Sequence, residues 1–454
     1  MKQNNHTRRD VLKMLGLGSL AMTVPGASGV SAESRKPNVV LIFADDQGSI
    51  DLNCYGASDL HTPNLDRLAG RGTRFTQFYV AAPVCSPSRA ALLTGRYPQR
   101  AGLATNTYGK RGMPAAQVTI AEMLKGAGYR TGLFGKWHLG DVPELSPNRQ
   151  GFEEFYGHKV GCIDNYSHFF YWQGPNRHDL WRNDEEVWED GEYFPDLVVR
   201  ESLRFMSKNK DRPFFMYLPF NMPHYPLQGE PEYRTMYNDT EEPRKSYAAF
   251  VSTLDEKIGT VIDAIDNLGL RDDTIIIYLS DHGHSTEERT FGGGGSSGPY
   301  RGYKFTLWEG GVRVPCIVSW PGHIEEGAVR DQTAISFDWM PTIAHYCGVQ
   351  LPDRPIDGQN IAPVIESADT QSPHDVLHWE IGKHWAVREG DWKLVFNGPE
   401  TEDRGVRIAK ESPFLSNLSE DVTETKNIAG AHPGVVQRLQ GLHEKWVTEV
   451  TQQE

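Results

Sequence analysis

Four short, largely apolar runs in this sequence each end abruptly in polar residues. The runs cover residues 38–44, 129–134, 213–220 and 274–280, and they lack the strict alternation of a half-exposed strand. Continuous apolar runs are typical of strands that are buried on both faces of a largely parallel sheet. The sequence therefore predicts a sheet that is covered by helices on both sides.

Helical patterns lie between these runs. From residue 250 to residue 268, apolar residues fall three or four apart, and Gly269 follows as a stop signal. Residues 65–69 and 118–125 predict shorter helices. Strands that alternate with helices indicate the α/β class, so we expect a large mixed, mostly parallel sheet sandwiched by helices.

The pattern changes after about residue 370. Residues 384–388 and 392–396 predict two strands of a hairpin, and residues 435–450 predict a helix. We therefore expect a main domain at 36–370 and a smaller C-terminal α+β domain at 371–454. The glycine-rich segment at 292–298 predicts a loop, since it lacks the pattern of a phosphate-binding loop.

The N-terminus has the features of an export signal. Arg8 and Arg9 precede an apolar stretch at 14–24, and small residues follow at 30–32. This order resembles a twin-arginine signal peptide, here residues 1–32, that passes through the export machinery and is then cleaved. The alternative is a short membrane anchor, but the apolar stretch is too short to span a bilayer. We expect a bacterial periplasmic or secreted protein without a membrane anchor in its mature form.

Charge and cysteine content narrow the functions further. The formal net charge of −14 argues against non-specific binding to nucleic acid, although it permits a locally basic pocket. Five cysteines are an odd count for an exported protein, which marks one of them for another role. If that one is Cys85, the other four allow three disulfide pairings or none. The four are Cys54, Cys162, Cys316 and Cys347.

Acidic residues follow two of the predicted strands. Asp45 and Asp46 come directly after the first run, and Asp281 and His282 come directly after the last. In open α/β sheets, ligands bind at the carboxyl ends of the strands, so these side chains should converge. The ordinary alternative is that each aspartate caps a helix or a turn. Three close carboxylates indicate a cation site, and oxygen ligands favour Ca²⁺ or Mg²⁺ over zinc.

The most specific motif begins at Cys85. Cys85, Pro87 and Arg89 form a Cys-x-Pro-x-Arg core, Leu-Thr-Gly-Arg follows at 93–96, and a helix is predicted at 88–94. This motif resembles the signature of formylglycine-dependent (type I) sulfatases in the alkaline-phosphatase-like superfamily, in particular the carbohydrate and polysaccharide branch. Further segments resemble the family in the same order, over residues 36 to 430. They are Asp45-Asp46, residues 135–140, Pro223-His224, Asp281-His282, Lys304 ahead of residues 309–311, and residues 415–421.

The resemblance implies two cofactors. A formylglycine-generating or sulfatase-maturating enzyme would oxidise Cys85 to 3-oxoalanine, the aldehyde also called formylglycine. One Ca²⁺ per chain, with Mg²⁺ the weaker candidate, would be held by Asp45, Asp46, Asp281, His282 and the modified Cys85. Asp281 would also accept the proton of the attacking hydroxyl. Many relatives have asparagine at the position of His282, which leaves the identity of the metal open.

The resemblance also implies the catalytic roles. A gem-diol at residue 85 would attack sulfur, the ester oxygen would leave, and sulfate would then be eliminated to restore the aldehyde. Arg89 and Lys136 would stabilise the diol oxygens, and His138 would be the base for sulfate release. His224 and Lys304 would bind the sulfate and the leaving oxygen together with Lys136, with His224 as the general acid. Taken singly, each of these residues could be an ordinary core or surface residue. Because all of them occur in the same order as in the family's motifs, catalytic roles are favoured.

Substrate selection should depend on loops at the rim of the pocket. Residues 161–182 are rich in polar and aromatic side chains that suit sugar rings, and His384 and Trp385 could join them. The candidates are Asp164, Asn165, Tyr166, His168, Trp172, Asn176, Arg177, His178, Trp181 and Arg182. We expect a sulfated sugar or polysaccharide as substrate. Three alternatives stay open, namely a packed insertion without a binding role, a phosphodiesterase or phosphonate hydrolase, and a non-catalytic protein that binds sulfated glycans.

Overall fold

The computed structural model describes residues 35–107, 111–172, 174–403, 406–408 and 410–452. The predicted signal peptide, residues 1–32, lies outside the described residues. The described residues from Lys36 onward form one compact unit. Within the described ranges, no helix is both long enough and apolar enough to cross a bilayer.

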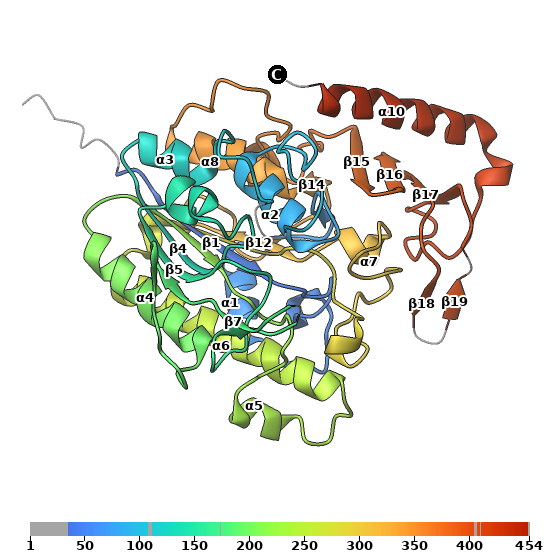
Figure 1. Ribbon diagram of the computed structural model, residues 1–454. Helices are drawn as coiled ribbons and strands as arrows, with labels where there is room; N and C mark the ends of the chain where they lie inside the picture. The colour runs from blue at the N-terminus through green and yellow to red at the C-terminus, as the bar shows by residue number, and fades with distance from the viewer. Residues whose placement is uncertain (1–34, 108–110, 173, 404–405, 409, 453–454) are drawn as a thin grey trace, which may run out of the picture. The chain divides into compact units, whose positions relative to one another are not determined.

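A ten-stranded sheet runs through this unit (Figure 1). In spatial order, its strands are β13 (Ala328–Arg330), β2 (Thr73–Phe75), β12 (Cys316–Ser319), β11 (Thr274–Ser280), β1 (Asn38–Ala44), β10 (Phe214–Pro219), β4 (Arg130–Lys136), β5 (Glu154–His158), β8 (Trp181–Arg182) and β9 (Glu185–Glu186).

The four predicted runs form adjacent, parallel strands at the centre of this sheet. The order β11-β1-β10-β4 is parallel throughout, and β5 continues it, whereas β12 pairs antiparallel with β11. Because all four strands point the same way, their carboxyl ends lie along one edge of the sheet. The mixed, mostly parallel sheet is therefore confirmed.

Both faces of the sheet are covered, which explains the unbroken apolar runs. On β1, Val39, Leu41 and Phe43 pack into the core beneath helices α2, α3 and α8, while the alternate residues pack against α1, α4 and α6 (Figure 1). The helices are α1 (Pro63–Gly70), α2 (Cys85–Thr94), α3 (Ile120–Gly126), α4 (Phe194–Asn209), α5 (Pro231–Met236), α6 (Arg244–Asn267), α7 (Glu309–Val312), α8 (Trp339–Cys347), α9 (Ala362–Glu366) and α10 (Pro433–Thr451).

Local signals explain where several helices start and stop. α6 contains the predicted helix except its last residue and ends two residues before Gly269, whose φ of 66° suits a glycine. Thr119 caps α3 in a reciprocal pair of hydrogen bonds with Glu122. The predicted start of α2 at residue 88 was wrong, because the helix begins at Cys85. Pro87 is tolerated in the first turn, where its missing N–H has no helical partner to bond.

The C-terminal segment forms a second, antiparallel sheet with α10 packed on it. Its strands, in order, are β15 (Val376–Ile381), β16 (His384–Glu389), β17 (Trp392–Phe396) and β20 (Phe414–Asn417). The β16–β17 hairpin and α10 match the predicted α+β elements, while the boundary at residue 370 stays a prediction. Three two-stranded sheets complete the described strands, namely β3 (Phe78–Tyr79) with β14 (Ala334–Ile335), β6 (Phe169–Phe170) with β7 (Arg177–His178), and β18 (Thr401–Asp403) with β19 (Val406–Ile408).

Candidate active site

The ends of β1 and β11 bring the predicted acidic residues together. Ala44 is in register with Ser280, so Asp45 and Asp46 leave one strand beside Asp281 and His282 on the other. The Asp46 N–H donates to Asp281 Oδ1 at 3.0 Å, and the Asp281 N–H donates to the Ala44 carbonyl at 3.1 Å. All four side chains are buried, as the prediction of convergence requires.

Three side-chain cations neutralise this acidic cluster. Lys136 ends β4, and its Nζ lies 2.6 Å from Asp45 Oδ2. Arg89 on α2 contacts Asp45 at 3.2 Å and Asp281 at 3.1 Å. Lys304 places its Nζ 2.9 Å from both carboxylate oxygens of Asp46. The predicted basic residues therefore reach the predicted acidic ones from three separate segments of the chain.

Cys85 lies among these groups at the first position of α2. Its Sγ is 3.3 Å from His282 Nε2 and 3.7 Å from Asp45 Oδ1. Burial disfavours the thiolate, but the ammonium groups of Lys136 and Lys304 outweigh burial and lower the pKa of the Cys85 thiol to about 7. All five cysteines are free thiols, which excludes the three disulfide pairings.

The carboxyl groups of the cluster have different electrostatic environments. Burial opposes ionisation of Asp46, but the ammonium of Lys304 and nearby imidazoles hold its pKa well below the usual range. Burial raises the pKa of Asp281 well above the usual range. The Asp281 and Cys85 charges outweigh burial at His282 and raise its pKa to about 9. Such divergent environments in one cluster are typical of a functional site.

The two predicted catalytic histidines flank the cluster. His224 Nε2 lies 3.7 Å from Asp46 Oδ2, while its Nδ1 lies 2.9 Å from the Tyr225 carbonyl. Burial lowers the pKa of His224 to about 3. His138 is 8% exposed, and within the described ranges its buried Nδ1 has no hydrogen-bond partner. Burial also holds the pKa of His138 well below its usual value, so both rings are neutral at pH 7.

The donors around Cys85 fit a hard divalent cation. Ligand atoms of Asp45, Cys85, Asp281 and His282 lie within 4.8 Å of one another, and so do those of a second group in which Asp46 and His224 replace Asp281 and His282. Carboxylates supply two of the four donors in each group, and such oxygen ligands favour Ca²⁺ or Mg²⁺. We did not predict His224 as a potential ligand, because in the sequence it follows Pro223 without a neighbouring acid.

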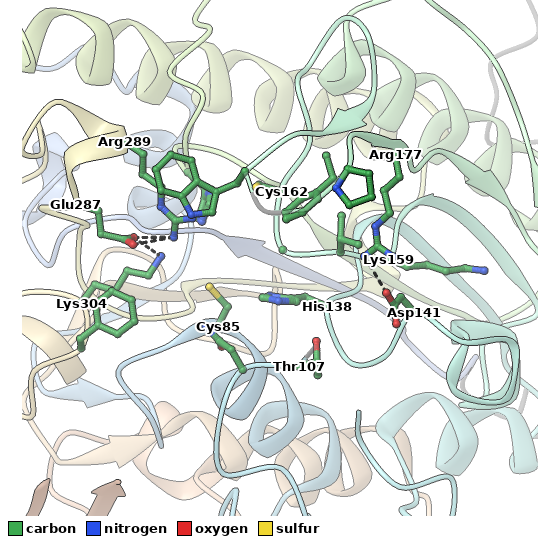
Figure 2. A pocket seen from close by; sticks show the side chains of 18 residues that line it. Cys85, Thr107, His138, Asp141, Lys159, Cys162, Arg177, Glu287, Arg289 and Lys304 are labelled. Carbon is green, nitrogen blue, oxygen red and sulfur yellow. Dashed lines mark hydrogen bonds and ion pairs between the residues drawn. The ribbon is translucent and has the colours of Figure 1, made fainter. Parts of the chain in front are cut away.

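A cavity of about 450 Å³ is lined in part by Cys85 (Figure 2). Four predicted catalytic residues reach its wall, and the predicted loop at 161–182 forms one side. The lining residues are Cys85, Asn106, Thr107, His138, Asp141, Lys159, Val160, Gly161, Cys162, Phe170, Trp172, Pro175, Arg177, His224, Glu287, Arg289, Lys304 and Phe305. The cavity is locally basic although the whole chain is acidic, as the charge analysis permits.

One side of the cavity carries a charged and aromatic group that we did not predict. The Arg289 guanidinium lies 4.2 Å from the ring centre of Tyr225 and 5.0 Å from that of Trp172. Glu287 pairs with Arg289 at 2.8 Å and reaches Lys304 at 3.4 Å (Figure 2). Glu287 and Arg289 follow closely after Asp281-His282, and that proximity in the sequence was the only available signal.

Some predicted rim residues have other positions. Trp172 and Arg177 line the cavity, but Tyr166 stacks on Tyr193 and is not among the lining residues. The suggestion that His384 and Trp385 join the rim was wrong. Trp385 stacks on Phe396 and His443 instead, because β16 packs against α10. The prediction of a rim at 161–182 is therefore correct only for part of that segment.

Lys136, Arg89 and Lys304 place positive charge around Cys85, the nucleophilic position. Such a site suits an ester that stays negatively charged throughout its hydrolysis. The fold and the site together define a hydrolase of anionic esters. Residues 37–349 match the family model described as Sulfatase, and residues 301–445 match the model described as N-sulphoglucosamine sulphohydrolase, C-terminal. The chain therefore belongs to the sulfatase family and is a sulfuric ester hydrolase.

Relatives extend over most of the chain. Arylsulfatase A of Homo sapiens is 37% identical, with 90% of this chain and 88% of that enzyme covered. N-acetylgalactosamine-6-sulfatase of Sus scrofa is 34% identical, with 81% and 73% covered. The crystal structure of Ps i-CgsB in complex with k-i-k-neocarrahexaose superposes with a TM-score of 0.83 at 31% identity, with 92% and 94% covered.

Proposed function

We propose that this sulfatase removes sulfate from a sulfated sugar or polysaccharide. The observation that carries the proposal is the position of Cys85. It lies among buried Lys136, Lys304 and Arg89 at the base of a cavity with an aromatic wall. The cations suit the sulfate group, and the aromatic wall suits a sugar ring.

Two groups complete the chemistry. A formylglycine-generating or sulfatase-maturating enzyme converts Cys85 to 3-oxoalanine, and Asp45, Asp46, Asp281 and His282 hold one Ca²⁺ beside it. When present, the aldehyde supplies the nucleophile as its hydrate, and the cation supplies positive charge to the sulfate oxygens. The thiol pKa of about 7 suits maturation, because the thiolate is the reactive form.

The remaining roles belong to side chains that face this position. Lys136 and Arg89 stabilise negative charge at residue 85, and Lys304 binds the sulfate. Asp281 accepts the proton of the attacking hydroxyl. Asp281 is held in place for this role by the Arg89 guanidinium, which lies 3.1 Å from its Oδ2.

The two histidines move the remaining protons. His138 takes a proton at the step that releases sulfate, which its neutral ring allows. His224 presents its Nε2 to the site because its Nδ1 faces a carbonyl. The negative charge of bound sulfate favours protonation at Nε2, from which the proton passes to the leaving oxygen.

A sugar substrate is supported by the pocket wall and by the relatives. Trp172, Glu287 and Arg289 combine an aromatic face with a hydrogen-bond acceptor and a donor, the groups that sugar hydroxyls require. Relatives include a sulfatase of N-acetylgalactosamine and a protein solved with a neocarrahexaose. We therefore favour a galactose or N-acetylgalactosamine sulfate, whether at a chain end or within a polysaccharide.

The proposed life cycle follows from the N-terminal signal. Residues 1–32 direct the folded protein to the twin-arginine export machinery, so Cys85 is modified in the cytoplasm and the mature enzyme acts in the periplasm or outside the cell. We also propose residues 36–370 as the catalytic domain and 371–454 as the C-terminal domain.

The test is a panel of sulfated mono- and oligosaccharides, with free sulfate measured by ion chromatography. The enzyme is produced with a maturating enzyme, and mass spectrometry of residues 75–96 verifies the aldehyde. We expect sulfate release from at least one sulfated sugar and none from the Cys85→Ala variant. Faster turnover of a phosphodiester than of every sulfate ester would favour the phosphodiesterase alternative. Binding of sulfated glycans without turnover would favour the non-catalytic one.

A further inference from the structure

Two histidines lie at the base of the β6–β7 hairpin, away from the catalytic cluster. His168 directly precedes β6, and His178 ends β7 opposite Phe169. Asp190 lies in the segment that follows β9. One ligand atom from each of His168, His178 and Asp190 lies within 4.8 Å of the other two.

Hydrogen bonds orient both imidazole rings in the same manner. His168 Nε2 lies 3.1 Å from the Glu192 carbonyl, and His178 Nδ1 lies 2.9 Å from Glu186 Oε1. A carbonyl or a carboxylate only accepts hydrogen bonds, so these two nitrogens carry the protons. In the neutral rings, the lone pairs are therefore on His168 Nδ1 and His178 Nε2.

Those two nitrogens are both buried, and neither has a hydrogen-bond partner among the residues that the structure describes. The His168 ring is fully buried, and His178 is 8% exposed, with its ring stacked at 3.8 Å on Trp188. A buried acceptor without a partner is unfavourable, because it has lost its hydrogen bond to water, and this site has two such acceptors. A ligand that accepts both lone pairs removes that cost.

We propose that His168, His178 and Asp190 bind one transition-metal cation of the zinc class. Two imidazoles and one carboxylate, completed by water, form a common donor set for zinc. A point equidistant from three atoms that are 4.8 Å apart lies about 2.8 Å from each, so shifts of under ~1 Å reach zinc–nitrogen bond lengths. Glu186 and the Glu192 carbonyl orient the ligating rings, as outer partners do in established zinc sites.

The cation would stiffen one wall of the substrate cavity. Between His168 and His178, the hairpin carries Trp172, Pro175 and Arg177, and all three line the cavity. Asp179, the next residue after His178, accepts hydrogen bonds from the backbone of Lys159 and Val160 on the same wall. The proposed site is separate from the sulfatase chemistry, since none of its three ligands is among the residues that line the cavity.

The experiment titrates the mature enzyme with Zn²⁺ by calorimetry, with excess Ca²⁺ present to saturate the oxygen-rich catalytic site. We expect one Zn²⁺ per chain, a Zn²⁺-dependent rise in melting temperature, and binding at least ~10-fold weaker in His178→Gln. Asp190→Asn removes an exposed ligand with little risk to folding and should weaken binding in the same direction. Its matched control is Glu185→Gln, which removes another exposed carboxylate nearby and should leave binding unchanged.

Three results would overturn the proposal. One is the absence of Zn²⁺ uptake by the wild-type enzyme. A second is equal weakening in Asp190→Asn and Glu185→Gln, which would indicate non-specific attraction. The third is uptake that persists in His178→Gln but is lost in Asp46→Asn, which would place the zinc in the catalytic cluster.

Discussion

The substitution Lys393→Met tests how the C-terminal sheet holds the catalytic part of the chain. The Lys393 ammonium on β17 is fully buried, and it lies 2.8 Å from Glu309 and 3.2 Å from Glu424. Methionine preserves the volume but leaves the two carboxylates without that cation. Breaking a buried ion pair costs about 3–5 kcal/mol. Glu309 keeps Arg313 at 3.2 Å and the Tyr79 hydroxyl at 2.6 Å, so we expect the lower figure, about 3 kcal/mol.

The loss of stability should also depend on pH. Burial raises the pKa of Glu424 from about 4.5 to about 7, even with Lys393 present. The folded state therefore binds this proton more tightly than the unfolded state, and that stabilisation is lost as pH rises through 7. Without Lys393 the pKa of Glu424 rises further. Each additional pKa unit lowers the unfolding free energy of the variant, relative to wild type, by about 1.4 kcal/mol above pH 8. The deficit should be smaller at pH 5.5 than at pH 8.5.

Urea unfolding at these two pH values measures the effect. The control is Lys445→Met, since Lys445 is 76% exposed and lies 3.8 Å from Glu449, where the expected change is below ~0.5 kcal/mol. Adding Glu424→Gln to Lys393→Met should recover stability at pH 8.5. A Lys393→Met variant within ~1 kcal/mol of wild type at both pH values, or a larger deficit at pH 5.5, would refute the reasoning.

Four further predictions concern activity and stability. Cys85→Ala should abolish sulfate release while leaving the circular dichroism spectrum and melting temperature close to wild type. Removing divalent cations with a chelator should slow sulfate release at least ~100-fold, and Ca²⁺ should restore more activity than Mg²⁺. Arg289→Ala should raise KM for a sulfated oligosaccharide more than it lowers kcat, because Arg289 lines the cavity wall and does not contact Cys85. The effect on a small aryl sulfate should be smaller. Burial lowers the pKa of His378 to about 3, so the stability that its neutral ring contributes is present above pH 6.5 and is lost as pH falls toward 3. Between pH 7 and pH 5, His378→Gln should therefore lose about 2 kcal/mol less unfolding free energy than the wild type, as measured by urea unfolding.

The central strands and the convergence of the acidic pairs were predictable from local sequence. Every residue of β1 is buried on one face of the sheet or the other, so its unbroken apolar run correctly predicted a strand that is covered on both faces. Once the strands are parallel, Asp45 and Asp281 must lie at the same edge. The Cys85 motif then added the catalytic interpretation through its resemblance to a family.

Features that depend on distant packing were not predictable. Lys393 and Glu309 are 84 residues apart in the sequence, and no pattern in either segment predicts that they form an ion pair. Trp385 looked like a sugar-binding aromatic, but its position on β16 directs it toward α10. The orientation of His168 and His178 depends on Glu192 and Glu186, which have no distinctive spacing in the sequence.

Sulfate measured by ion chromatography after incubation with sulfated galactose and N-acetylgalactosamine oligosaccharides tests the central claim most directly. The mature enzyme, verified by mass spectrometry to carry the aldehyde at residue 85, should release sulfate, and the Cys85→Ala variant should release none. A verified, Ca²⁺-loaded enzyme that releases no sulfate from any of these sugars, yet cleaves phosphodiesters, would contradict the account.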